Sequence, residues 1–178
     1  MPYTLQQLSD IEEIRMLKHR YFRGIDTANA ELLATLFTDD VTVDYRGGEY
    51  RVNLQGKDTM LEFLANSFNS QVAAMHHGHM PEITITGEDT ADGIWYLEDI
   101  FINLAGKTHT IGSAIYKDQY RRVGGKWKIE RTEYDRVFEV VFPLSENAKL
   151  TSHHLARAGL KPDQLTDISS MISWTKAA

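Results

Sequence analysis

The first 25 positions of the chain place apolar side chains three or four residues apart, which is the spacing of one buried stripe on an α-helix. Ser9 followed by Glu12 fits the S-x-x-E capping box that opens a helix. We therefore expect a helix that begins beside Ser9 and ends near residues 26–27. Its apolar stripe consists of Ile11, Ile14, Leu17, Tyr21 and Ile25.

Residues 30–68 then predict a short helix, a hairpin and a third helix. Gly47 and Gly48 interrupt a β-branched and aromatic run, which is the pattern of two strands joined by a turn. The third helix carries its apolar residues at Met60, Leu61, Phe63, Leu64 and Phe68. The elements expected from this stretch are a helix over residues 30–37, strands over 41–45 and 50–54, and a helix that begins at residues 56–58.

After about residue 72 the hydrophobic period changes from that of a helix to that of a strand. Ile83 and Ile85 alternate with polar neighbours, and Gly124-Gly125 is a two-residue hairpin signal. The apolar phase slips after Ile129, which predicts a β-bulge near Thr132. Three further long strands are expected over residues 91–103, 109–123 and 126–142.

Helices first and a curved antiparallel or mixed sheet afterwards predict an α+β layer fold. Three helices in the N-terminal half would close the open side of the sheet over a cone-shaped hydrophobic pocket. We expect residues 1–144 to form this domain and residues 145–178 to form a partly helical tail. A last helix should begin at Pro162-Asp163 and carry Leu165, Ile168, Ile172 and Trp174.

The composition narrows the class of protein. A length of 178 residues fits one domain with a tail, and a net charge of -6 argues against binding to nucleic acid or to an anionic membrane surface. The absence of Cys excludes disulfides, thiolate metal sites and a cysteine nucleophile. No apolar run approaches the roughly 20 residues of a membrane span, and the first residues lack a signal-peptide pattern, so we expect a cytoplasmic protein.

The most unusual segment is Met-His-His-Gly-His at residues 75–79. On a strand, His77 and His79 share one face and His76 lies on the other. Two histidines without an evident third ligand do not make a metal site, so no metal is expected. Two interpretations stay open: a surface histidine cluster beside one buried histidine, or one histidine facing the pocket as a general base.

Three other residues have two interpretations each. Asp26 is either a solvated carboxylate at the end of the first helix or the partner that orients a histidine. Tyr21, just over one turn earlier, either packs in the core or projects into the pocket. Arg136 either snorkels outward or points inward, where it needs a carboxylate or an anionic ligand. The aromatic residues of the later strands are expected mainly in the core, with some of them lining a pocket.

Three segments of the chain resemble SnoaL-like domains of the nuclear transport factor 2-like superfamily. They are residues 10–26, residues 75–85 with Met-His-His-Gly-His-Met-Pro-Glu-Ile-Thr-Ile, and residues 93–99 with Gly-Ile-Trp-Tyr-Leu-Glu-Asp. Residues 116–127 add to the resemblance, which covers roughly residues 9–141. Within the superfamily the chain is most similar to the bile acid 7-alpha-dehydratase group and more distantly similar to scytalone dehydratase.

The resemblance implies a cone-shaped α+β barrel and assigns roles to the ambiguous residues. The family's catalytic tyrosine, aspartate and histidine fall on Tyr21, Asp26 and His76, and its functional arginine falls on Arg136. The second histidine of scytalone dehydratase has no counterpart in residues 99–101. As substrate-binding candidates we take Tyr45, His79, Trp95, Tyr116 and Tyr134.

The leading hypothesis is a lyase without metal or other cofactor that eliminates water from a bulky, hydrophobic, hydroxylated substrate. Asp26 would hold one tautomer of His76, Tyr21 would donate a hydrogen bond, and Arg136 would bind an anionic part of the substrate or assist the leaving oxygen. The alternatives are a formaldehyde-releasing lyase on a lignin-derived diarylpropane diol, an isomerase or polyketide cyclase, and a non-catalytic binding module. The resemblance also implies a homodimer or homotrimer.

Overall fold

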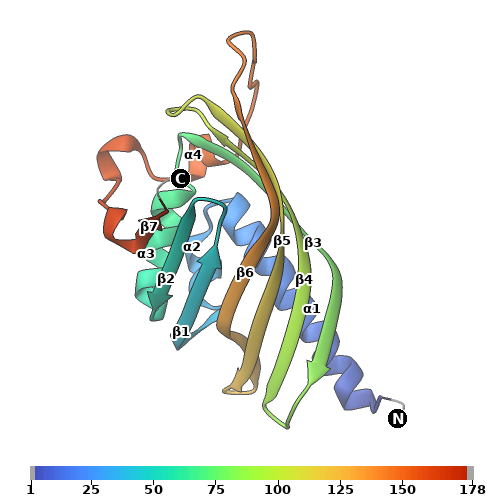
Figure 1. Cartoon of the computed structure of the whole chain (residues 1–178). Coiled ribbons are helices and arrows are strands. Elements are labelled where there is room, and N and C mark those ends of the chain that lie inside the picture. The colour runs from blue at the N-terminus through green and yellow to red at the C-terminus, as the bar shows by residue number, and fades with distance from the viewer. Residues whose placement is uncertain (1–2, 176–178) are drawn as a thin grey trace.

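The computed structural model describes residues 3–175 and begins with the long helix α1 (Leu5–Asp26), which lies along one face of the sheet (Figure 1). The helix begins earlier than Ser9 because Thr4 and Gln7 cap it reciprocally. Thr4 Oγ1 accepts from the Gln7 backbone N–H at 3.1 Å, and the Gln7 side chain accepts from the Thr4 N–H at 3.0 Å. The predicted end at residues 26–27 is confirmed.

The next segment forms the short helix α2 (Ala30–Ala34), strands β1 (Phe37–Arg46) and β2 (Tyr50–Gln55), and helix α3 (Lys57–Ser67). The prediction of a second helix up to residue 37 was wrong at its end. Phe37 is fully buried and begins β1, because it fills the core beneath α1 instead of continuing a helix. The hairpin and the third helix are confirmed.

Four long strands follow: β3 (Val72–Ile85), β4 (Thr90–Asn103), β5 (Thr108–Val123) and β6 (Lys126–Pro143). Each of them pairs antiparallel with the next, β1 runs parallel to β6, and the sheet order is β3-β4-β5-β6-β1-β2-β7. The α+β class and the curved mixed sheet are confirmed. The sheet stays open because its two edges, β3 and β7, do not pair.

Two local predictions for the long strands hold. Gly124 and Gly125 have φ angles of 58° and 76°, the left-handed values that a tight hairpin between β5 and β6 requires. The phase slip in β6 is a bulge at Glu130, since Gln119 pairs with Arg131 while Tyr120 pairs with Ile129. The bulge turns Thr132 and Tyr134 to the same buried face as Ile129.

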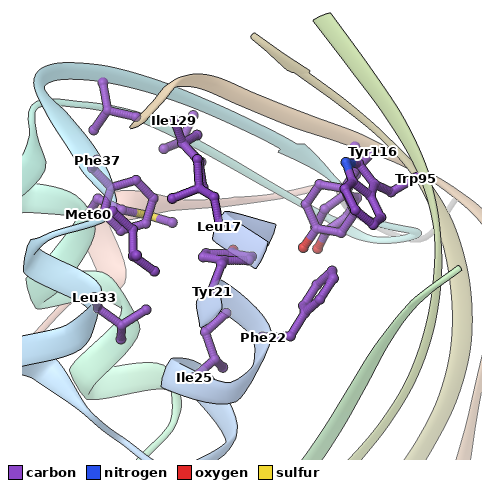
Figure 2. Close-up of a cluster of buried hydrophobic side chains, with 14 of the residues drawn as sticks. Leu17, Tyr21, Phe22, Ile25, Leu33, Phe37, Met60, Trp95, Tyr116 and Ile129 are labelled. Carbon is purple, nitrogen blue, oxygen red and sulfur yellow. The ribbon is translucent and has the colours of Figure 1, made fainter. Parts of the chain in front are cut away.

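The core fills the space between α1 and the concave face of the sheet (Figure 2). Leu17, Tyr21, Phe22 and Ile25 on α1 are each at most 5% exposed. Removing these side chains from water holds the helix on the sheet. Across from them lie Phe37, Met60, Trp95, Tyr116 and Ile129.

The C-terminal segment contains helix α4 (Leu155–Ala158), two short 3₁₀ turns (Pro162–Gln164 and Ser169–Met171) and strand β7 (Ile172–Trp174). The predicted helix from Pro162 onward was wrong. The side-chain oxygen of Asn66 on α3 accepts from the backbone N–H of Thr166 at 2.8 Å. This contact holds the segment against α3, and the chain then continues into β7, which pairs with β2. Among residues 3–175 no helix has the length and apolar character needed to cross a membrane.

Candidate active site

A pocket of about 350 Å³ opens between the concave face of the sheet, α1, α3 and β7. Its volume falls within the range of small-molecule sites, roughly 300–1,000 Å³. Most of its wall is aliphatic or aromatic, and a few polar groups converge in it. Tyr21 and Ile25 come from α1, Phe63 and Phe68 from the α3 region, and Ile172 and Trp174 from β7.

Asp26 and His76 meet at the edge of this pocket. His76 Nδ1 lies 2.6 Å from Asp26 Oδ1, and the backbone N–H of His76 donates to Asp26 Oδ2 at 3.0 Å. Both carboxylate oxygens are therefore engaged by one residue of β3 while α1 ends at Asp26. Because an ionised carboxylate only accepts, this contact places the imidazole proton on Nδ1 and leaves the Nε2 lone pair free.

Two phenylalanines hold the imidazole ring in place. The Phe22 ring lies nearly parallel to it at an interplanar angle of 7° and a centroid distance of 6.1 Å. The Phe68 ring meets it edge-on at 5.2 Å. The His76 side chain is only 9% exposed, although the pocket reaches it. The ring is thus oriented by the hydrogen bond between Nδ1 and Asp26 and by its packing against Phe22 and Phe68.

A group of tyrosines forms another polar part of the pocket wall. Tyr21 and Tyr45 share a hydrogen bond of 2.7 Å between their hydroxyls, and Tyr50 and Tyr134 share one of 2.5 Å. The Tyr45 and Tyr134 rings stack at 4.5 Å. Burial raises the pKa of Tyr21, Tyr45 and Tyr134 well above the usual tyrosine value, so these hydroxyls are protonated at neutral pH and can donate.

Arg136 points inward and finds carboxylates there. Its Nη1 and Nη2 donate to the two oxygens of Asp99 at 2.5 and 3.0 Å, and its Nε lies 3.0 Å from Glu139 Oε2. Burial lowers the pKa of Arg136, but the Asp99 hydrogen bonds and nearby charges outweigh it, so the net pKa lies well above the usual arginine value. A Cβ at Gly112 would lie 2.6 Å from Nη1, so glycine leaves room for this pair.

Two predicted substrate-binding residues lie away from the pocket, which corrects the prediction. Trp95 is fully buried and donates its Nε1–H to the Tyr120 hydroxyl at 2.9 Å, so it belongs to the core below the pocket. His79 is exposed on the outer face of the sheet, 3.3 Å from Glu98 Oε2. The other three candidates, Tyr45, Tyr116 and Tyr134, line the pocket.

The outer face also holds His77, which lies beside His79 and Glu98. Within the described part of the chain these are the residues whose donor atoms, all within 4.8 Å of one another, have a spacing that a metal ion could bridge. All three side chains are about half exposed. They face away from the pocket, so an ion bound there would not touch a molecule beside His76.

Sequence reasoning missed several groups at the site. Asp99 and Glu139 contact Arg136 because Asp99 on β4 pairs with Gly112 on β5, and Gly112 pairs with Glu139 on β6. This register becomes visible only once the β4–β5 and β5–β6 pairings are known. The segment Trp-Tyr-Leu-Glu-Asp contained the residue, but nothing in its spacing gave the partner.

A buried ion pair below the tyrosine wall was also missed. Lys18 on α1 and Asp118 on β5 are fully buried and 2.7 Å apart. The Lys18 ammonium lies 3.6 Å from the centre of the Tyr116 ring. Burial lowers the pKa of Lys18, and Asp118 offsets part of that effect. As an ion pair it carries no net charge, and the Lys18 nitrogen packs against the ring of Tyr116, which lines the pocket.

Residues 6–133 match the model of a family described as the SnoaL-like domain. A scytalone dehydratase-like protein from Novosphingobium aromaticivorans is 22% identical, with a TM-score of 0.68 over 75% of this chain and 87% of its own. A hexachlorocyclohexane dehydrochlorinase, LinA type 2, is 19% identical, with a TM-score of 0.72 over 83% and 99%. LinA type 3 from Novosphingobium barchaimii is 18% identical, with a TM-score of 0.69 over 83% and 98%. At sequence identities this low, the structural likeness establishes a shared fold and not a shared activity.

Proposed function

Because the chain belongs to the SnoaL-like domain family and has its nuclear transport factor 2-like fold, we propose that it is a cofactor-independent lyase that eliminates water from a hydrophobic, hydroxylated substrate. One observation carries the proposal. Asp26 binds His76 through both of its oxygens, and the free Nε2 of His76 belongs to a residue that lines an apolar pocket.

In this proposal His76 Nε2 takes a proton from a substrate carbon next to the one that bears the hydroxyl. The C–H electron pair forms the new double bond, and the C–O bond breaks toward the leaving oxygen. The imidazolium returns its proton to that oxygen, so water departs and His76 is neutral again. Asp26 stabilises the imidazolium while it exists and keeps the proton of the resting ring on Nδ1.

The tyrosine wall and Arg136 stabilise charge on oxygen. Tyr21 is a protonated donor that can bind a substrate carbonyl or phenol oxygen on which negative charge accumulates. Asp99 accepts from one N–H group on each of Nη1 and Nη2 of Arg136, and the remaining N–H groups on these two nitrogens can donate to the leaving oxygen.

The structural neighbours support an elimination. The names of two of them, a scytalone dehydratase-like protein and a dehydrochlorinase, denote loss of a small molecule from a carbon skeleton. SnoaL-like proteins share this fold across different reactions, so the assignment rests mainly on the Asp26–His76 geometry.

The proposal is tested by mass spectrometry of the protein, with chelator present, after incubation with hydroxylated 3-oxo steroids and with diarylpropane diols. Loss of one water from a substrate, abolished in His76→Gln and retained in the neighbouring outward-facing variant His77→Gln, is the expected result. Loss of water together with formaldehyde from a diol would support the same catalytic residues but assign them a different lyase reaction. A product that has the same mass as its substrate but a different structure would indicate an isomerase instead of a lyase.

A further inference from the structure

Acidic side chains outnumber basic ones in the pocket wall. Among residues 3–175, Glu49, Asp99 and Glu139 line the pocket, and Arg136 is the single Lys or Arg residue that does so. In this part of the wall three carboxyl side chains stand against one guanidinium. In a hydrophobic pocket the electrostatic interactions of such charges are stronger, because little water screens them.

Arg136 has no free edge for an anion. A carboxylate or phosphate is best bound by two parallel N–H groups on one edge of a guanidinium. Asp99 accepts from the edge formed by Nη1 and Nη2, and Glu139 Oε2 lies 3.0 Å from Nε, the atom that every other two-donor edge requires, so a second carboxylate already stands beside that edge. The three side chains are 10%, 5% and 16% exposed, so these contacts are shielded from water.

The tyrosines, by contrast, present donors suited to neutral oxygen. In each hydroxyl pair, Tyr21–Tyr45 and Tyr50–Tyr134, one O–H bonds to the partner oxygen. The second O–H of each pair is left to donate to a ligand carbonyl or hydroxyl. Neutral hydroxyls bind such oxygens without bringing a net charge into the apolar pocket.

We propose that this pocket selects uncharged ligands and excludes anionic ones, with Glu139 and Glu49 as the specificity-determining residues. The substrate of the proposed elimination is then a neutral alcohol, phenol or ketone that carries no carboxylate, phosphate or sulfate inside the pocket. This substrate class rests on the proposed function, whereas the charge selection itself concerns binding and is measurable without turnover.

The test uses two ligands of nearly equal shape, 2-naphthamide and 2-naphthoate, whose dissociation constants are measured by calorimetry at neutral pH. The wild-type protein should bind the neutral amide at least about tenfold more tightly than the carboxylate. Glu139→Gln removes one carboxylate and should lower the ratio of the two dissociation constants, carboxylate over amide, by about tenfold. Glu49→Gln changes an exposed lining residue, so it should narrow the same ratio and have little effect on folding.

Glu98→Gln is the matched control, since it removes the same charge from the outer face of β4. It should leave the ratio unchanged. Equal or tighter binding of 2-naphthoate by the wild type, or a ratio insensitive to both pocket variants, would overturn the charge selection. Failure of both ligands to bind at millimolar concentration would overturn it as well, because an accessible apolar pocket is part of the claim. A lyase assay that fails while the ratio behaves as expected would contradict only the proposed function.

Discussion

At the scale of single residues, the position of the His76 ring depends on a glycine two positions further along β3. A Cβ placed on Gly78 would lie 2.4 Å from Phe22 Cε2, well inside van der Waals contact. Phe22 is the ring that stacks on His76. The glycine in Met-His-His-Gly-His therefore lets a core aromatic reach the face of the candidate catalytic imidazole.

We predict that Gly78→Ala displaces Phe22 and lowers the rate of turnover by about tenfold, with a loss of about 1–3 kcal/mol in the free energy of unfolding from overpacking. Urea denaturation and steady-state kinetics measure both quantities. Combining the change with Phe22→Leu should restore stability but not the rate, because the clash is relieved and the stacked ring is absent. Unchanged kinetics in Gly78→Ala would show that Phe22 does not position His76.

Sequence reasoning reached some single residues and missed others for identifiable reasons. Alternation along β3 correctly separated His76 from His77 and His79, but alternation says which residues share a face and not which face is inward. The prediction for His79 failed on that point. Trp95 does face inward, yet its depth along β4 puts it below the pocket against Tyr120, and periodicity contains no information on depth.

At the scale of secondary-structure elements, Asp10 joins the first helix to the β5–β6 hairpin. Asp10 is 3% exposed. Its Oδ1 accepts from Arg122 at 2.7 Å, from Trp127 at 3.2 Å and from Gln6 at 3.0 Å. Burial raises the pKa of Asp10, but these three hydrogen bonds and the Arg122 charge outweigh it, so the net pKa is below the usual 3.8.

Asp10→Asn should destabilise the protein at neutral pH by about 1.5–3 kcal/mol, the contribution of hydrogen bonds to a charged group. Because the pKa is lower in the folded state, the stabilisation is complete above pH 3.8 and is lost as the pH falls through the folded pKa. Urea unfolding at neutral pH and near pH 3 measures the difference between wild type and variant. A difference that is the same at both pH values would contradict an ionised, hydrogen-bonded Asp10.

Most elements were predictable because long runs keep one period. The strands β4, β5 and β6 end within one residue of their expected bounds, and the glycine pair between β5 and β6 forms the expected turn. The errors occur where tertiary contacts determine the secondary structure. Phe37 joins a strand because the core takes it, and the segment after Pro162 is held to α3 through Asn66.

At the scale of the whole molecule, the C-terminal segment completes the pocket. Strand β7 adds to the edge of the sheet beside β2, and both Ile172 and Trp174 line the cavity. Trp174 is 68% exposed and lies 6.1 Å from the Tyr50 ring, so it stands at the mouth. Composition separated this tail from the domain, but its pairing with β2 is a long-range contact that no local pattern revealed.

Trp174→Ala should raise KM about 3- to 10-fold and leave kcat unchanged, because the exposed ring would contact a bound ligand without taking part in the proton transfer. Steady-state kinetics with the substrate identified by mass spectrometry measures both constants. Leu150→Ala, also in the tail but absent from the pocket wall, serves as the control. A fall in kcat with constant KM would place Trp174 in the chemical step instead.

The homodimer or homotrimer implied by the family resemblance stays a prediction. Tyr96, Phe138 and Val140 on β4 and β6 are 41%, 51% and 40% exposed, an apolar surface that a second copy could cover. Light scattering should give two or three times the chain mass for the wild type and a lower mass for Phe138→Lys. A single-chain mass for the wild type would contradict the prediction.

The central claim is that Asp26 and His76 act as one acid–base unit, and a double-mutant cycle tests it most directly. Turnover rates are measured for wild type, Asp26→Asn, His76→Gln and the double variant, with His77→Gln as the control. Each single change should lower kcat by about 10²-fold or more, and the double variant should be little slower than either, because residues that act as a unit are not additive. Rates within a few-fold of wild type in either single variant, or fully multiplicative losses in the double variant, would contradict the account.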